Sequence, residues 1–381
     1  MPILSHRKMC TRCILTDSFP RLTFDSEGIC SICRDYDRWV SGWKSRLPEQ
    51  KKTLEKICAR AKSKHKEFDA LIPYSGGKDS SFVLYVAKKE FGLNCLAYTA
   101  DNGYLSELAK KNINKTCRKL GVEHVYYGFN PELMNRLYAL FVRKTGYPCS
   151  ACMRAIAVGI YKLADMYDIP IVIQGTSVRT ELPLSREMAE HGSLPHVRGV
   201  LKGEPIAGDC KRILSDMSMR RKIGHVLFRL SGRKRLITYA WFNLAEYTDW
   251  NYDVILDTIQ KELDWTAPEE TEHMDCIIHP IQKYIQFRRF PDLDLDRLRY
   301  ARLIMVGQMT REEALHRLEK HSEQCSDAVL HLFLKNIKTR KEEFDRYIDM
   351  GPRHLQYYSP TVLEKLVRKF LPRGSWHAKQ Y

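Results

Sequence analysis

The segment from Tyr74 to Ser80 constrains the fold of this chain more than any other. Its sequence is Tyr-Ser-Gly-Gly-Lys-Asp-Ser, with an apolar run at residues 68–74 before it and an amphipathic run at residues 81–90 after it. This pattern predicts a buried strand, a tight turn through the two glycines and the start of a helix. Because a helix N-terminus presents free N–H groups and glycine lets the backbone come close, the segment indicates a phosphate site.

The side chains of this loop also fit a phosphate site. Lys78 adds a positive charge beside the glycines, and Ser75 and Ser80 add hydroxyl donors. The loop is shorter than that of the common P-loop, and an Asp follows its Lys. Asp79 has two interpretations: a carboxylate that faces Mg²⁺ or handles a proton, or an acid that the helix dipole favours in the first turn.

Strand-like and helix-like patterns alternate over residues 68–174. We expect strands at residues 68–74, 94–100, 124–127 and 169–174, and helices at residues 81–91, 106–120, 131–144 and 151–167. Such alternation predicts an α/β fold, namely a Rossmann-like parallel sheet with helices on both faces. Ligands of these sheets bind at the carboxyl ends of the strands, which are expected at Ser75–Gly77, at Asp101 and at Gly175-Thr176.

The rest of the chain divides by composition. We expect a cysteine-rich module at residues 1–45, a Lys-rich helical connector at 46–67, the phosphate-binding domain at 68–240 and a helical, basic C-terminal region at 241–381. Residues 178–236 are expected to be irregular.

Two Cys-x-x-Cys pairs stand near the N-terminus. Cys10 and Cys13 form the first pair, Cys30 and Cys33 form the second, and 16 residues separate them. This spacing predicts a Cys₄ zinc ribbon with a closed, tetrahedral site. A module this short and polar buries little apolar surface, so the metal would supply much of its folding free energy.

A third pair, Cys149 and Cys152, lies within the phosphate-binding domain. A lone pair of this kind fits a redox site, half of a zinc site or ordinary core positions. The chain has 12 cysteines and no secretion signal, which favours the reducing cytoplasm. No apolar run is long enough to span a membrane.

The net charge of +16 favours an anionic partner such as a nucleic acid, a nucleotide, an anionic sugar or a membrane surface. A basic stretch at residues 211–235 could bind phosphates or carboxylates, or could simply be solvated. It lacks the interleaved aromatic residues on which single-stranded bases stack.

The Ser75–Ser80 loop resembles the pyrophosphate loop of the PP-loop ATP pyrophosphatases, which have a HUP-type Rossmann-like fold. The resemblance implies ATP and Mg²⁺ as cofactors, adenylation of a substrate oxygen, release of pyrophosphate, and catalytic roles for Lys78 and Asp79. The implied ATP-binding residues are Tyr74, Ser75, Gly76, Gly77, Lys78, Asp79, Ser80, Asp101, Gly175 and Thr176.

Three regions together resemble the N-acetyl sugar amidotransferases of surface-polysaccharide biosynthesis. They are Cys10–Cys33, the Ser75–Ser80 loop and the sequence Met-Thr-Arg-Glu-Glu-Ala-Leu at residues 309–315. This resemblance implies the ATP-dependent conversion of an N-acetyl group on a sugar or nucleotide-sugar into an acetamidino group. A separate glutaminase subunit would supply the ammonia.

Cys149 and Cys152 are instead similar to the pair that holds a [4Fe–4S] cluster in tRNA sulfurtransferases with the same loop. That similarity implies one further cysteine, for which Cys276 is the first candidate and Cys210 the second. Cys149, Cys152 and Cys276 would then be catalytic. The leading prediction is therefore nitrogen transfer to a sugar, and the alternative is thiolation of tRNA or of a small molecule.

Overall fold

Within the residues that the structure describes, five parallel strands form a single sheet in the order β3-β2-β1-β4-β5. The structure is a computed structural model that describes residues 7–19, 22–177, 192–230, 240–268, 275–289, 295–319, 325–349, 357, 359–362 and 365. The strands are β1 (Ala70–Pro73), β2 (Cys95–Asp101), β3 (Glu123–Gly128), β4 (Ile171–Gln174) and β5 (Ala240–Asn243). The predicted parallel Rossmann-like sheet is confirmed.

The chain reverses its direction of travel across the sheet at β1. It builds β2 and β3 on one side of β1 and then returns to place β4 and β5 on the other side. Ala70 of β1 is accordingly paired with Cys95 of β2 and with Ile171 of β4. Such a reversal opens a crevice at the carboxyl ends of the two central strands, where ligands of this fold class bind.

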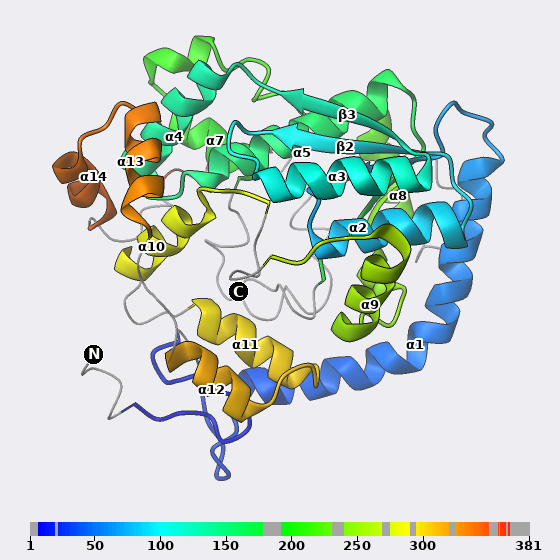
Figure 1. Ribbon diagram of the computed structural model, residues 1–381, viewed down its shortest axis with the longest axis horizontal. Coiled ribbons are helices and arrows are strands. Elements are labelled where there is room, and N and C mark those ends of the chain that lie inside the picture. Colours follow the sequence, from blue (N-terminus) through cyan, green and yellow to red (C-terminus); the bar gives the residue numbers. More distant parts are fainter. Residues whose placement is uncertain are drawn as a thin grey trace.

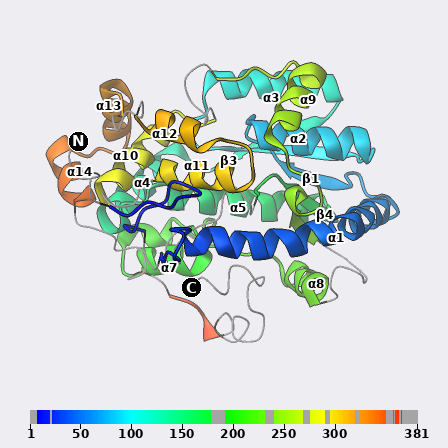
Figure 2. The same ribbon diagram turned by 90° about the horizontal axis from the view of Figure 1, so that it is seen from below.

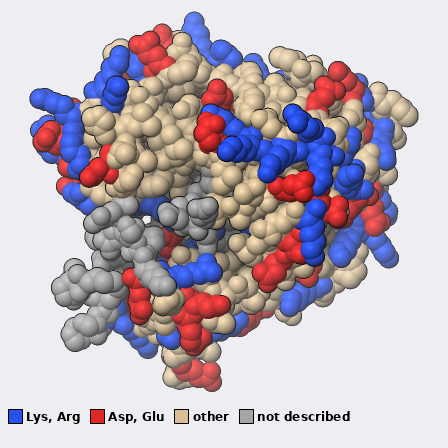
Figure 3. Space-filling view, viewed as in Figure 1, with Lys and Arg blue, Asp and Glu red and all other residues tan. Residues whose placement is uncertain are grey.

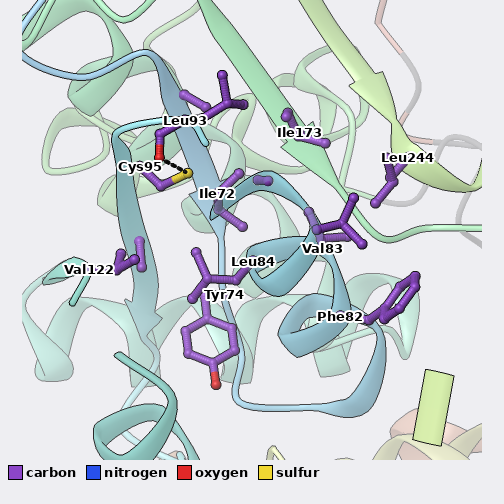
Figure 4. Packing of buried hydrophobic residues seen from close by; sticks show 14 of the residues in the cluster. Ile72, Tyr74, Phe82, Val83, Leu84, Leu93, Cys95, Val122, Ile173 and Leu244 are labelled. Carbon is purple, nitrogen blue, oxygen red and sulfur yellow. Dashed lines mark hydrogen bonds between the residues drawn. The ribbon is translucent and has the colours of Figure 1, made fainter. Parts of the chain in front are cut away.

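Helices cover both faces of the sheet (Figures 1 and 2). On one face lie α2 (Lys78–Tyr85), α3 (Glu107–Leu120) and α9 (Tyr252–Leu263), and on the other lie α5 (Cys149–Met166) and α8 (Met219–Leu230). The side chains of successive β1 residues point to opposite faces of the sheet: Ile72 packs against α2 and Leu71 packs against α5. Figure 4 shows Ile72 beside Val83 and Leu84 of α2 and Ile173 of β4.

A long helix and a set of C-terminal helices surround this α/β unit. Helix α1 (Ser31–Lys62) begins within the second Cys-x-x-Cys pair and runs without interruption to the sheet. Five helices share a second hydrophobic core with part of α5. They are α4 (Pro131–Thr145), α7 (Leu194–Leu201), α10 (His279–Arg289), α13 (Asp327–Asn336) and α14 (Lys341–Ile348). Helices α11 (Leu295–Met305) and α12 (Arg311–Glu319) pack on the cysteine module instead.

The prediction that residues 178–236 are irregular was wrong for part of that stretch. It contains α7, a 3₁₀ turn at Pro205–Gly208 and α8, while residues 178–191 and 231–239 lie outside the described residues. Helix α8 is basic, and it is held by tertiary contacts: the buried guanidinium of Arg221 pairs with Asp165 and donates to the carbonyl of Ile169 at 2.9 Å. Strand β5 was missed as well, although it is no shorter than β1 or β4.

The segment after α9 fastens the phosphate loop to α3. Asn112 of α3 is fully buried and donates from Nδ2 to the carbonyl of Thr266 at 2.9 Å, while its Oδ1 accepts from the N–H of Thr266 at 3.0 Å. The neighbouring Trp265 donates from Nε1 to the carbonyl of Gly76 at 2.8 Å. The conformation of the loop therefore depends on a segment that is distant in sequence.

We expect Asn112→Ala to lower the free energy of unfolding by roughly 1–3 kcal/mol, because it removes both hydrogen bonds between the buried Asn112 amide and the backbone of Thr266. Asn114→Ala is the matched control, since Asn114 is exposed on the same helix and should change stability by less than about 0.5 kcal/mol. Denaturant unfolding of both variants measures the difference, and equal stability of the two would contradict the role of the Thr266 contact.

Candidate functional site

The phosphate loop follows β1 directly and leads into α2. Gly76 has a left-handed φ of +80°, and a Cβ at this position would lie 2.7 Å from the carbonyl oxygen of Ala109. Only glycine therefore fits between the loop and α3. The close contact with Ala109 and the hydrogen bond from Trp265 to the carbonyl of Gly76 together fix the conformation of the turn.

Hydroxyl groups tie the loop to the first turn of α2. Ser75 Oγ lies 3.3 Å from Ser80 Oγ and accepts from the N–H of Gly77 at the same distance. Ser81 Oγ donates to the carbonyl of Gly77 at 2.8 Å. Among the described residues no side chain caps α2 at Gly77, so its first N–H groups remain available to an anion.

Lys78 and Asp79 lie together at the start of α2. Lys78 Nζ is 2.5 Å from Asp79 Oδ1 and 4.7 Å from the ring centroid of Tyr252, at the start of α9. The ammonium group is thereby held at the mouth of the loop by a carboxylate and an aromatic face. The ammonium group of Lys78 would therefore be in position to neutralise part of the charge of a phosphate bound at the loop.

The other predicted strand ends lie around the same crevice. A Cβ on Gly175, directly after β4, would lie 3.0 Å from the carbonyl oxygen of Asp79, so this backbone passes close to the start of α2. Thr176 is exposed next to it. Asp101, at the end of β2, is exposed and accepts from the N–H of Gly103 at 3.0 Å, which closes the turn there.

Tyr74 points away from the loop and into the core. Its hydroxyl lies 3.3 Å from both Ser81 Oγ and the carbonyl oxygen of Asn112, and its own carbonyl accepts from Thr99 Oγ1 at 2.5 Å. Figure 4 shows its ring at the side of α2, near Leu84. Tyr74 is therefore a buried residue that anchors the start of the loop to α2, α3 and β2.

A short strand-like contact brings residues 275–277 to the loop. The N–H of Ser106 donates to the carbonyl of Asp275 at 3.1 Å, and the N–H of Ile277 donates to the carbonyl of Tyr104 at 2.9 Å. The carboxyl of Asp275 lies near Ser75, and burial raises the pKa of that carboxyl above its usual value. Sequence reasoning singled out Cys276 and passed over Asp275, because nothing local indicates this pairing.

The same contact completes a cluster of three cysteines. Asn102 Nδ2 lies 3.7 Å from Cys152 Sγ and 3.6 Å from Cys276 Sγ. Cys149 stands one turn before Cys152 in α5, close enough to Cys152 and Cys276 for their charges to affect its pKa. Cys210, the second candidate, is buried elsewhere, with Asp209 and Arg136 as its charged neighbours.

Burial raises the pKa of all three thiols, that of Cys276 to about 12. Without a metal they are neutral at pH 7, whereas a bound metal ion would deprotonate them. The cluster lies beside the phosphate loop because Asp275 and Cys276 are adjacent in sequence and contact the loop and Asn102, respectively.

The four N-terminal cysteines form a compact site. Their sulfur atoms all lie within 4.8 Å of one another and are buried, and within the described part of the chain they are the one such group of three or more potential ligands. Backbone N–H groups of Cys13 and Cys30 point at Cys10 Sγ, at 3.4 and 3.2 Å. This arrangement can hold one tetrahedrally coordinated metal ion.

The C-terminal region holds this metal module in place. Arg297 of α11 donates to the carbonyl of Ile14 at 2.9 Å, and Arg311 of α12 donates to the carbonyl of Cys13 at 3.2 Å. Arg302 is fully buried beside the thiols, and this burial lowers the pKa of its guanidinium to about 10. Its positive charge offsets part of the negative charge that four thiolates would bring.

The basic stretch at 211–235 is largely occupied by internal pairs where it is described. Arg220 pairs with Asp168 and Lys222 with Asp216, and Arg221 is buried. Residues 231–235 lie outside the described residues. Figure 3 instead shows a band of Lys and Arg over α3. Its exposed cations are Lys110, Lys111, Lys115, Arg118 and Lys119.

A family model, a curated relative and a solved structure are similar to parts of this chain. Residues 245–369 match the family model described as "LPS biosynthesis protein WbpG-like, C-terminal domain". This range contains Trp265, Asp275, Cys276 and the helices that hold the metal module.

A curated relative, described as "Uncharacterized protein MJ1599" of Methanocaldococcus jannaschii, is 24% identical over 186 residues. The match covers 48% of this chain and 63% of that protein, so the chain spans less than two thirds of the relative's length. The solved structure of NMN synthetase from Francisella tularensis aligns with 60% of this chain and 99% of its own, at 13% identity and a TM-score of 0.28. This score is too low to support a conclusion.

In the described part of the chain, every helix is too short or too polar to cross a lipid bilayer.

We expect Gly76→Ala to abolish ATP binding, because its Cβ would collide with the carbonyl of Ala109 and displace the loop. Gly103→Ala is the matched control: Gly103 has nearly the same φ, +79°, but no atom lies within 4 Å of an added Cβ. In both variants the alanine must adopt a left-handed conformation, which costs about 1–2 kcal/mol. The difference in ATP affinity between them, measured by calorimetric titration, therefore reports the effect of the collision alone. ATP binding by Gly76→Ala as tight as by Gly103→Ala would show that the wedge is unimportant.

Proposed function

We propose that this protein uses ATP to adenylate an oxygen of an N-acetyl sugar, releases pyrophosphate, and then replaces the adenylated oxygen with nitrogen. The observation that carries the proposal is the Ser75–Ser80 loop, with Lys78 at a helix N-terminus in the crevice between β1 and β4. The match of residues 245–369 to a WbpG-like domain of LPS biosynthesis supports a sugar as the acceptor.

In the proposed first step, the amide oxygen of the acceptor attacks the α-phosphorus of ATP. The bond to the β-phosphate breaks, and pyrophosphate leaves with the bonding electrons. The loop N–H groups and Lys78 would bind that departing charge, as preorganised donors do in other phosphoryl transfers. Asp79, at 2.5 Å from Lys78, would face Mg²⁺.

In the proposed second step, ammonia attacks the activated carbon, AMP leaves with the oxygen, and one proton is released. The product is an acetamidino group. A separate glutaminase subunit would supply the ammonia.

Zinc would occupy the Cys10, Cys13, Cys30 and Cys33 site, where four buried sulfur ligands suit a closed structural ion.

Lys78→Met should lower acceptor-dependent pyrophosphate release by about 100-fold or more, because the charge that faces the leaving group is lost. The assay supplies ATP, Mg²⁺, ammonium and a panel of N-acetyl sugars, free and nucleotide-linked. Lys89→Met is the matched control, since Lys89 is exposed at the far end of the same helical segment. Full activity of Lys78→Met, or no release by the wild-type protein with any sugar, would refute the proposal.

A second candidate function is favoured by the cysteine cluster around Asn102. Asn102 Nδ2 lies within 3.7 Å of Cys152 Sγ and 3.6 Å of Cys276 Sγ, and Cys149 stands one turn before Cys152, which supports these half-buried thiols as ligands of a [4Fe–4S] cluster. A cluster bound through three cysteines keeps one iron open to sulfide. The adenylated oxygen would then be replaced by sulfur, on tRNA or on a small molecule.

Under this second candidate, anaerobically purified protein should contain iron as well as zinc. Cys276→Ala should lose the iron and keep the zinc, whereas Cys210→Ala should keep both, because Cys210 lies outside the cluster. Elemental analysis and the visible absorbance measure this. A colourless wild-type protein with zinc alone would exclude thiolation and leave nitrogen transfer in place.

A further inference from the structure

A pocket of about 430 Å³ lies where three distant parts of the chain meet. Arg12 of the cysteine module and Tyr36, Asp37, Trp43 and Lys44 of α1 form one side. The segment at residues 249–251, before α9, and the residues at the end of α11 close the other sides. Figures 1 and 2 show α11 alongside the first half of α1. The volume falls within the usual range for a small-molecule site.

The walls of this pocket are fixed by contacts between those parts. Trp43 Nε1 lies 3.4 Å from the carbonyl oxygen of Glu246, and Gln308 Nε2 donates to the carbonyl of Trp250 at 2.9 Å. Arg12 pairs with Asp37 across the mouth. The pocket is therefore largely formed before any ligand arrives, which reduces the entropy lost on binding.

The pocket also adjoins the phosphate loop. Trp250, which lines the pocket, packs edge-on against Phe82 of α2 at a centroid distance of 5.5 Å. Tyr252, two residues later, holds Lys78 at 4.7 Å. The short segment at residues 249–252 thus contributes both to the wall of the pocket and to the support of the loop lysine, which links the pocket to the loop through one piece of chain.

The polar groups of the lining are balanced in charge. Two carboxylates, Asp37 and Asp249, face two cations, Arg12 and Lys44, with the amide of Asn251 among them. Carboxylates accept hydrogen bonds from hydroxyl groups, whereas a phosphate backbone would be repelled by them and would require excess cations. The aromatic residues Trp43, Trp250 and Tyr36 are nearly buried in the walls, so the surface offered to a ligand is mainly polar, which suits the hydroxyl groups of a sugar.

We propose that this pocket binds the sugar ring of the acceptor, a neutral, hydroxyl-rich N-acetylated hexose, with the diphosphate of any nucleotide-linked form outside the pocket. The inference rests on the proposed function, since it names the place where that acceptor binds. The lining favours a sugar over an RNA segment because its charges cancel. The acetamido group would extend from the pocket towards the loop.

Two pairs of variants test the pocket directly. Val40→Trp fills it, while Val254→Trp adds the same bulk at a valine that is 59% exposed on α9. Asp249→Asn removes one carboxylate from the lining, while Asp253→Asn makes the same change at an exposed position on α9. Circular dichroism and ATP titration check that each variant folds and retains its nucleotide site.

The measurement is calorimetric binding of N-acetylglucosamine, N-acetylgalactosamine and N-acetylmannosamine, each free and as its UDP conjugate, to the full chain. We expect at least one to bind, and Val40→Trp and Asp249→Asn to weaken that binding by about 10-fold or more relative to their controls. ATP affinity should stay unchanged. Tighter binding of the UDP conjugate than of the free sugar would identify the nucleotide-linked form, and equal binding the free form.

Because binding is measured without turnover, its failure differs from failure of the proposed function. Sugar binding that the pocket variants weaken, without pyrophosphate release, would refute the chemistry and keep the pocket. Turnover with unchanged KM in Val40→Trp and Asp249→Asn would keep the chemistry and overturn the pocket. Binding of no sugar, or equal binding by Val40→Trp and Val254→Trp, would overturn it as well. So would loss of affinity for a single-stranded RNA probe in Val40→Trp but not in Val254→Trp.

Discussion

The left-handed turn at Gly76 is the constraint on which the rest of the site depends. The turn is wedged against the carbonyl of Ala109 on α3 and held by the indole N–H of Trp265. Without both contacts the N–H groups at the start of α2 would have no fixed direction. The first contact comes from the α/β unit itself, and the second from the region that matches the WbpG-like domain. The phosphate loop is therefore a joint product of two parts of the chain.

The fold and the loop could be predicted from sequence because their signals are local. The strand, glycine pair and helix around Ser75–Ser80 are contiguous, and so is each Cys-x-x-Cys pair. Contacts between distant segments gave no such signal. Asp275 reaches Ser75 only because residues 275–277 lie against residues 104–106 through an isolated pairing. The wall formed by Trp250 likewise depends on tertiary packing, and α8, one helix of the supposedly irregular region, is held by a buried arginine, Arg221.

The net charge of +16 reflects cations on the outer surface of the protein more than cations in its pocket. The band over α3 contributes five exposed cations, of which Lys110 pairs with Glu107 and Lys119 with Asp264. The pocket beside Trp250, in contrast, balances its own charges. A strongly basic chain can thus contain a pocket whose lining is nearly neutral, so the total charge does not predict the charge of that lining.

Helix α1 has a consequence for how the protein matures. Its 32 residues extend over about 48 Å, from the cysteine module at one end to the core beneath the sheet at the other. Arg12 stands between two of the four cysteines and also lines the pocket, so the pocket exists only once that module is folded. The core of the phosphate loop lies in the sheet and needs no such step. Metal binding by the cysteine module would therefore govern whether this pocket forms, whereas the phosphate loop would form without it.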